Sequence, residues 1–297
     1  MKRWLIYQKE RFPLLAHGPL IAAFSACAVA FSSLLRGAPA PGWQSYLTAF
    51  GVCLLMFLQL RIADEFKDAD EDARWRPYRP VPRGLVKLSE LRVMFIIAAV
   101  IQIGLVLAHD IRLLLVLAVA WTYLTLMSVE FFCRSWLKAR PVVYLLTHMG
   151  IMPLVDFFGT ACEWLPRGSS TPSGLGWFLA ASFFNGIVIE ICRKLRQPGD
   201  EEEGVETYSR LWGKSGGAAS WLAALLATLG CAGMAASRIG FAGPLMLGLG
   251  TILAIVILLL PRYIYGQLPG KRIESITGLW TLTLYLLLGI VPLCLRG

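Results

Sequence analysis

Three regularly spaced aspartates are the residues of this chain best suited to chemistry. Asp64, Asp68 and Asp72 recur every fourth residue in a segment with six acidic residues, which an Arg-Pro run follows. On a helix each step of four residues turns about 40°, so the three carboxylates would share one face. Such a face favours Mg²⁺ bridged to a diphosphate, because Mg²⁺ keeps water and phosphate ligands. The alternative is a solvated acidic loop after an apolar helix.

A second charged cluster follows the sixth apolar stretch of the chain. Glu190 stands at the end of that stretch, where a carboxylate needs a partner or a polar cavity, and Lys194 comes one turn later. A metal ligand and a simple Glu–Lys pair both fit this position. Arg193, Lys194 and Arg196 precede Asp200. This mixture suits a metal bound together with an anion, because cations neutralise phosphate oxygens that the metal leaves uncovered.

Charged and polar residues also flank and enter the fifth apolar stretch. Arg134 and Lys138 precede Pro141, a residue well suited to begin a helix. These two cations either bind an anion or only orient the chain in a membrane. His148 and Asp156 lie inside the stretch, where each would line a cavity or form a buried hydrogen-bonded pair with another helix.

The composition indicates a membrane protein. Hydrophobic residues make up 57% of the chain and charged residues 16%, and the mean hydropathy is +0.62, which no single soluble core accommodates. We expect an all-α polytopic bundle of about nine transmembrane helices around a central cavity, forming one domain over residues 1–297. The stretches long enough to cross a bilayer are 19–35, 46–62, 91–109, 113–129, 142–161, 176–192, 217–236, 241–260 and 278–295.

The distribution of Lys and Arg predicts how the chain lies in the membrane. The N-terminal segment and the even-numbered connections hold 22 of the 28, whereas the odd-numbered connections and the C-terminus hold five. The N-terminus and the acidic loops 62–90 and 193–216 are therefore expected in the cytoplasm, and the C-terminus outside. This bias accounts for the net charge of +9 without nucleic acid as a partner. We expect an integral protein of a bacterial inner membrane.

These motifs together resemble the UbiA superfamily of intramembrane prenyltransferases. The resemblance covers nearly the whole chain: an acidic motif after the second span, R-P-V-P-R-G behind it, and G-D-x-x-x-G-V-x-T after the sixth. It implies a helical bundle in which two acidic motifs face each other across a cavity and bind Mg²⁺ with an isoprenyl diphosphate. It also implies that the apolar tail of that substrate lies among the helices, in contact with membrane lipid.

Carried over by position, the resemblance assigns metal binding to Asp64, Asp68, Asp72 and Asp200. Lys138 matches a lysine that holds the diphosphate in family members. The other matching positions are Arg79 with Pro80, Gly84, Gly204 and Thr207.

The chain departs from the family pattern at two positions. Arg196 stands where the second motif usually has an aspartate, and Arg134 stands where a tyrosine usually precedes the lysine. Two alternatives follow: Glu190, Glu201 or Glu203 replaces the missing ligand, or the added cations replace part of the metal's work.

The resemblance implies ionisation of an allylic diphosphate by Mg²⁺, with Asp64, Asp68, Asp200 and Lys138 as the catalytic residues. The residues expected to bind the diphosphate are Arg79, Arg134, Lys138, Arg193, Lys194 and Arg196. The metal ligands would be Asp64, Asp68, Asp72, Asp200 and Glu190. An apolar bundle then protects the carbocation from water, and a lipophilic acceptor, expected to be an electron-rich aromatic ring, is alkylated.

Two alternatives remain at this point. A UbiA-type terpene cyclase would ionise the same substrate and trap the cation within the same molecule. A membrane transporter for an anion or a divalent metal would use the carboxylates as a permeation site. The acidic motifs lie at helix ends rather than near the midplane, which disfavours the transporter.

Overall fold

The chain folds into helices along its length. The computed structural model describes residues 2–296, and no strand occurs within that range. Eight helical spans are long and apolar enough to cross a membrane, and α6 (Leu113–Ser128) is a shorter apolar helix. The prediction of an all-α bundle of about nine membrane helices is therefore confirmed.

The spans differ in their continuity. The unbroken ones are α2 (Leu14–Leu35), α3 (Trp43–Lys67), α5 (Leu88–His109), α6, α10 (Leu175–Arg193) and α12 (Ala242–Ile264). Helix α11 (Tyr208–Ser237) kinks at Gly213, whose backbone is not helical. Two are interrupted: α8 (Pro141–Met149) continues into α9 (Ile151–Trp164), and α13 (Gly270–Tyr285) continues through the π-helix Leu286–Ile290 into α14 (Val291–Arg296). The short elements are α1 (Lys2–Arg11), α4 (Ala69–Trp75), α7 (Arg134–Lys138) and the 3₁₀ turns Glu130–Phe132 and Pro198–Asp200.

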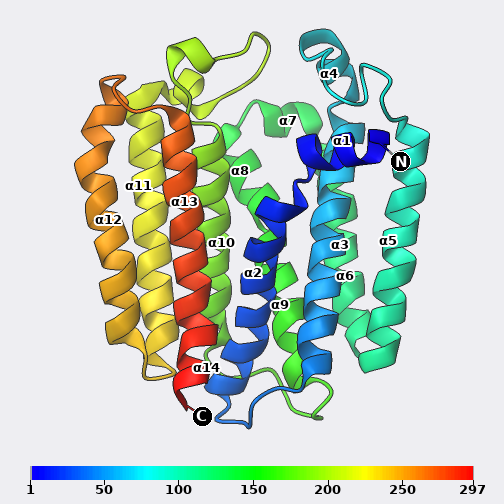
Figure 1. The fold of residues 1–297 in the computed structure, drawn as a ribbon, viewed down its shortest axis with the longest axis vertical. Coiled ribbons are helices and arrows are strands. Elements are labelled where there is room, and N and C mark those ends of the chain that lie inside the picture. The colour runs from blue at the N-terminus through cyan, green and yellow to red at the C-terminus, as the bar shows by residue number, and fades with distance from the viewer. Residues whose placement is uncertain (1, 297) are drawn as a thin grey trace.

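Figure 1 shows the spans standing side by side, with the short elements gathered at the two ends. The helices α1, α4 and α7 lie at one end, which we call the motif end because the aspartate segment is there. Helix α14 lies at the other, which we call the opposite end. The first and last helices thus lie at different ends, as an odd number of spans requires.

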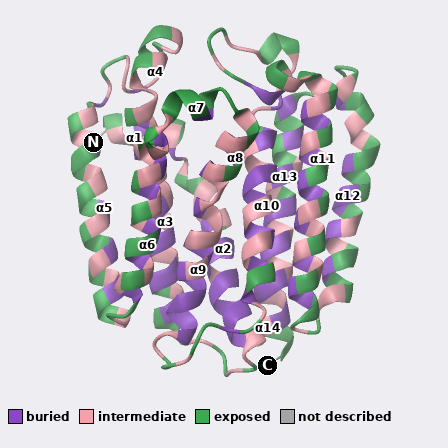
Figure 2. Ribbon diagram, turned by 180° about the vertical axis from the view of Figure 1, so that it is seen from behind, coloured by how far each residue is buried: buried purple, intermediate pink, exposed green. Residues whose placement is uncertain are grey.

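Small residues let the central helices approach closely. A Cβ atom at Gly159 of α9 would lie 2.8 Å from the Cβ of Ala28 in α2, and one at Gly289 would lie 2.7 Å from the backbone of Cys27. Membrane helices associate through van der Waals contacts of this kind. In Figure 2 buried residues gather on the central helices, whereas α5 and α12 carry many exposed ones. Leu247 of α12 is 75% exposed, as a side chain that faces lipid would be.

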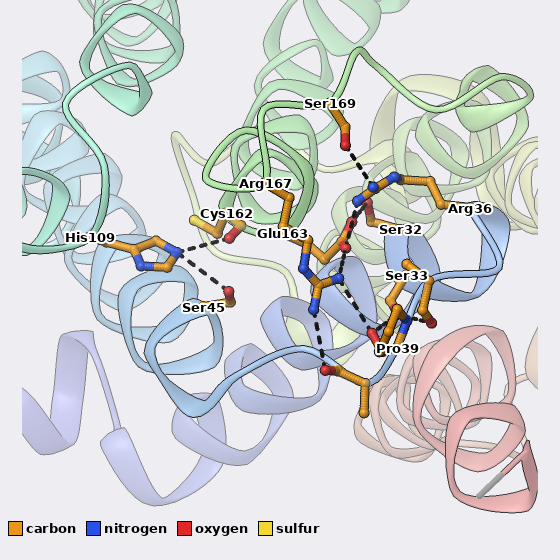
Figure 3. A network of polar contacts seen from close by, with 12 residues as sticks. Ser32, Ser33, Arg36, Pro39, Ser45, His109, Cys162, Glu163, Arg167 and Ser169 are labelled. Atoms are coloured by element: carbon orange, nitrogen blue, oxygen red, sulfur yellow. Dashed lines mark hydrogen bonds and ion pairs between the residues drawn. The ribbon is translucent and has the colours of Figure 1, made fainter.

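A buried carboxylate ties the connections together at the opposite end (Figure 3). Glu163 of α9 is 1% exposed and accepts hydrogen bonds from Ser32 at 2.7 Å and Arg36 at 2.8 Å. It also pairs with Arg167, while Arg36 donates to Ser169 at 2.6 Å. We call these five residues the Glu163 network. Because its members come from α2, α9 and the connection after α9, the network fastens these elements to one another.

The fifth span breaks at Gly150, and the break is built into the sequence. Pro153 has no N–H to donate to the carbonyl four residues earlier, so the helix cannot run through this point unchanged. The hydroxyl of Tyr123 in α6 donates to the carbonyl of Thr147 at 2.6 Å, which satisfies a backbone group near the break. A Cβ at position 150 would lie 2.2 Å from that hydroxyl oxygen, so only glycine leaves room for Tyr123. The break therefore fixes the last turn of α8.

Candidate active site

A cavity of about 680 Å³ lies between the two charged segments and the helices that carry them. Eight Lys and Arg side chains and six Asp and Glu side chains line it, so the charged part of its wall has a positive balance. Apolar residues of α2, α3, α8 and α10 line the remainder, which ends near Thr281 and Tyr285 of α13. This arrangement suits an amphipathic ligand with an anionic head and an apolar body.

The first aspartate motif divides at the end of α3. Asp64 lies in the last turn of α3 and Asp68 just beyond it, and both line the cavity. Asp72 in α4 is 2% exposed, and its carboxylate pairs with Arg76 and Arg79 at 2.7 Å each. The expectation that a single continuous helix carries all three carboxylates is wrong, because α3 ends at Lys67 and the chain turns at Asp68. Asp72 therefore meets two arginines rather than the cavity.

The two carboxylates of the aspartate motif that line the cavity, Asp64 and Asp68, are loosely held. Asp64 is 3.6 Å from Arg61 and 3.7 Å from Lys67, and Asp68 forms no ion pair among the described residues. Burial raises the pKa of Asp68, although the nearby Lys67 ammonium opposes this. Loosely held oxygens of this kind are available to a bound cation.

Lys138 meets the same motif from across the cavity. Its ammonium donates a hydrogen bond to Glu71, and this contact holds the pKa of Glu71 below its usual range. Lys138 lines the cavity, as the sequence predicted for a diphosphate ligand. Arg134 does not line it: the guanidinium is half-exposed, 3.6 Å from Glu71 and 3.8 Å from Glu130. Arg79 lines the cavity while it pairs with Asp72.

The second cluster divides in a similar way. Glu190, Arg193 and Lys194 line the cavity, and Glu190 pairs with Lys194 at 3.0 Å and with Arg193 at 3.7 Å. The Glu–Lys pair and the position beside the cavity therefore occur together. Arg196 and Asp200 do not line the cavity, although both belong to the connection from α10 to α11, which lies at the motif end (Figure 1). The backbone N–H of Arg196 donates to Ser209 at 2.7 Å, which fixes this turn of the chain.

The two charged segments touch each other beside the cavity. Gly204 has φ +71°, and a Cβ there would lie 2.2 Å from the ring of Trp75, so glycine is required for both the turn and the contact. Tyr78 donates to Glu202 at 2.6 Å. Thr207 caps α11 by accepting a hydrogen bond from Arg210. The matching Gly and Thr positions of the second motif thus shape the segment.

Several cavity residues escaped the sequence prediction. Lys67 donates to the hydroxyl of Tyr144 at 2.8 Å and lies beside Asp64, so it belongs to the charged wall. Lys67 stands between the predicted metal ligands Asp64 and Asp68 in the sequence, but the predicted membrane orientation already accounted for its positive charge. For His148 and Asp156 the sequence left open both a cavity position and a buried pair, and of these two His148 lines the cavity, whereas Asp156 is fully buried and does not. Tyr144 carried no sequence pattern of its own.

Among residues 2–296 no group of three or more Asp, Glu, His or Cys side chains lies close enough to hold a metal alone. Asp64 and Asp68 offer two carboxylates on one side of the cavity. A closed protein cage is therefore absent from this range, while a cation completed by phosphate and water still fits the donors present.

Known proteins share this architecture. A homologue of UbiA from Aeropyrum pernix K1, in its apo structure, superimposes with a TM-score of 0.68 over 91% of this chain and 96% of its own, at 13% identity. A digeranylgeranylglyceryl phosphate synthase structure gives a TM-score of 0.61 over 96% and 98% of the two chains, at 16% identity. No curated protein sequence matches significantly. The sequence model of the UbiA prenyltransferase family matches residues 23–294, so this integral membrane protein belongs to that family.

Proposed function

We propose that this protein is a Mg²⁺-dependent prenyltransferase that transfers the prenyl group of an isoprenyl diphosphate to a lipophilic acceptor, with an electron-rich aromatic ring as the expected class. The observation that carries the proposal is the single continuous cavity wall described above. It joins available carboxylates and a surplus of cations to an apolar interior between membrane helices.

The charged wall suits the diphosphate. Lys67 reaches it from α3, Lys138 from the short helix α7, and Arg193 and Lys194 from the end of α10, so cations surround the position from several directions. Each charge placed near the departing diphosphate stabilises the negative charge that develops as the C–O bond breaks. Arg79 adds a cation from the Arg-Pro segment.

Asp64 and Asp68 are the proposed Mg²⁺ ligands. Mg²⁺ commonly uses one or two carboxylates and takes its other ligands from substrate phosphates and water, which matches the donors that line this cavity. When bound, the ion would act as a Lewis acid on the diphosphate oxygens. Glu190 faces the same cavity and becomes available to a cation if Lys194 turns toward the diphosphate.

The apolar interior suits the prenyl chain and the acceptor. Phe24 and Phe57 line it with their rings in edge-to-face contact at 5.6 Å, and Tyr144 lies nearer the charged wall. Aromatic faces attract a carbocation, and an interior without charged groups keeps water from quenching it. Membrane lipid surrounds the bundle.

We further propose that the motif end faces the cytoplasm and that the protein lies in a bacterial inner membrane. The excess of Lys and Arg at the motif end supports this orientation. Single cysteines introduced at position 67 and at position 295 should react with a membrane-impermeant reagent from different sides of the membrane. Labelling from the same side would contradict the proposed orientation.

The direct test is incubation of the purified protein with labelled prenyl diphosphates of several lengths, with and without Mg²⁺ and a membrane extract as a source of acceptors. We expect a labelled lipophilic product only when Mg²⁺ and the extract are both present. A cyclic hydrocarbon or alcohol formed without extract would instead identify a terpene cyclase. Absence of diphosphate release under every condition would refute the proposal.

A further inference from the structure

His148 has a geometry that the proposed binding of diphosphate and metal does not use. It lies in the last turn of α8, is 7% exposed and lines the cavity. Its Nδ1 atom lies 2.9 Å from the carbonyl oxygen of Tyr144. Its Nε2 atom is buried and has no hydrogen-bond partner among the described residues.

The contact with Tyr144 determines which nitrogen carries the proton. A carbonyl oxygen only accepts hydrogen bonds, so Nδ1 must be the donor, and the neutral ring then holds a lone pair on Nε2. The ring has little freedom to turn, because it stacks on the Tyr144 ring with centroids 3.8 Å apart and meets Phe131 edge-on at 6.1 Å. The break at Gly150, just below, fixes the same turn of the helix.

The position of His148 in the cavity is equally specific. Along the lining face of the fifth span, Tyr144 of α8 contacts Lys67 of the charged wall, whereas Met149 at the end of α8 and Met152 of α9 belong to the apolar interior. His148 lies between them. The reacting carbon of a prenyl diphosphate must lie at this boundary, because its phosphate end belongs to the charges and its chain to the apolar side.

Prenyl transfer leaves a proton to be removed. The C–O bond of the diphosphate breaks, its electron pair leaves with the diphosphate, and a bond forms between the prenyl carbon and the acceptor. The adduct then carries a positive charge, on the oxygen of a hydroxyl acceptor or on the ring of an aromatic one, and the acceptor atom must lose the proton that the prenyl group replaces. Because such a cationic adduct is a strong acid, a neutral imidazole is basic enough to take this proton.

Resting on the proposed function, we propose that Nε2 of His148 accepts the proton that the acceptor loses during prenyl transfer. The acceptor therefore carries hydrogen on its reacting atom, as a hydroxyl oxygen or an aromatic ring carbon does. The competing acceptor of the proton is the departing diphosphate itself.

The test separates ionisation from transfer in a single turnover of labelled prenyl diphosphate, with released diphosphate and prenylated product measured independently. In the wild type the two should appear together. In His148→Gln, whose amide can donate to the Tyr144 carbonyl but cannot take the proton, we expect normal substrate binding and continued diphosphate release. Transfer should fall by about 10²-fold or more, and prenyl alcohol or diene should appear instead. His109→Gln, at the opposite end of the molecule, is the matched control and should behave as wild type.

If His148→Gln folds poorly, a second measurement with His148→Ala tests the same proposal. Added imidazole should restore transfer in His148→Ala by at least tenfold without changing diphosphate release. Transfer within about threefold of wild type in His148→Gln, or an equal loss of release and transfer, would overturn the proposal while leaving the proposed function intact. A folded wild-type protein that releases no diphosphate would refute both.

Discussion

Glu163 at the opposite end and Asp68 at the motif end are carboxylates held in opposite ways. At the opposite end, Glu163 receives three donors, and its network also satisfies Arg36 and Arg167 (Figure 3). At the motif end, Asp68 is partly buried without an ion pair among the described residues, and burial raises its pKa. In the first arrangement every buried charge has a partner, so the loss of any one partner destabilises the fold. The second keeps a carboxylate available to a ligand at a cost in stability.

The comparison also bears on the transporter alternative. Passage of an ion through the bundle would require the opposite end to open as well as the motif end. Opening there would part Glu163 from Arg36, Arg167 and Ser32 and leave a charged group buried without partners, which costs several kcal/mol by a rough estimate. An enzyme that exchanges substrates at the motif end or with lipid needs no such step.

The largest effect is expected from removing a carboxylate at the motif end. Asp68→Ala should reduce prenyl transfer by about 10²-fold or more, because it removes one of two proposed Mg²⁺ ligands. The protein should remain folded, since Asp68 holds no ion pair that packing depends on. Asp70→Ala removes the same charge from an exposed position of α4 and should stay within about twofold of wild type. A folded Asp68→Ala protein with normal activity would contradict the assignment.

The next largest effect is expected from removing Glu163 at the opposite end. Glu163→Ala should lower the free energy of unfolding by about 2 kcal/mol, because it leaves Arg36 and Arg167 facing each other without their shared partner. Both arginines retain some solvent contact, which limits the loss. Thermal unfolding in detergent micelles measures the change. Activity of the folded fraction should stay within about twofold of wild type, and a selective loss of activity would join the two ends functionally.

A smaller effect is expected when Asp68 becomes neutral, and it is a gain in stability rather than a loss. Asp68→Asn should stabilise the inactive protein by about 0.5 kcal/mol at neutral pH, since solvent near the charged wall screens part of the burial cost. The folded pKa of Asp68 is raised, so the wild type loses stability as Asp68 ionises. The gain should therefore be present above that raised pKa and vanish as the pH falls through it toward the ordinary value. Stabilisation that persists at acidic pH would point to another cause.

The smallest effect is expected at Arg196, which lies outside the cavity. Arg196 does not line the cavity, so Arg196→Ala and Arg196→Asp should leave activity within about twofold of wild type across a range of Mg²⁺ concentrations. Arg193→Ala removes a cation that does line it and should cost clearly more. If activity depended on Mg²⁺ concentration differently in the Arg196 variants and the wild type, the Arg196 side chain would belong to the active site.

Hydropathy and charge were enough to predict the spans, but not where the helices end. Helix α3 continues through Asp64 to Lys67, and α11 begins at Tyr208, because polar residues extend a helix beyond its apolar stretch. The turn at Asp68 follows from no local sequence rule, and it alone separates Asp72 from the cavity. Pro153 indicated an irregular fifth span, yet the contact of Tyr123 with Thr147 depends on helix packing.

For the candidate site, no single kind of sequence signal was sufficient. Asp64 and Asp68 were predicted from their spacing, Arg79 and Lys138 from the family resemblance, and Glu190, Arg193 and Lys194 from their charge, and all of them line the cavity. Asp200 was predicted from its motif and Arg134 and Arg196 from their charge, and none of the three lines it, because the surrounding segments turn in ways that the sequence pattern does not encode. The roles of all these residues in binding remain predictions.

The contact between the two charged segments has a consequence for the timing of turnover. Trp75 packs on Gly204, and Tyr78 donates one exposed hydrogen bond to Glu202, so a small contact joins segments that are far apart in sequence. Contacts of this size contribute about 1–2 kcal/mol together, which leaves a separated arrangement populated at roughly a few per cent or more. Separation is then a frequent local fluctuation on the microsecond to millisecond scale rather than an unfolding event. Under the proposed function, a contact this weak would part within each catalytic cycle and let the released diphosphate leave.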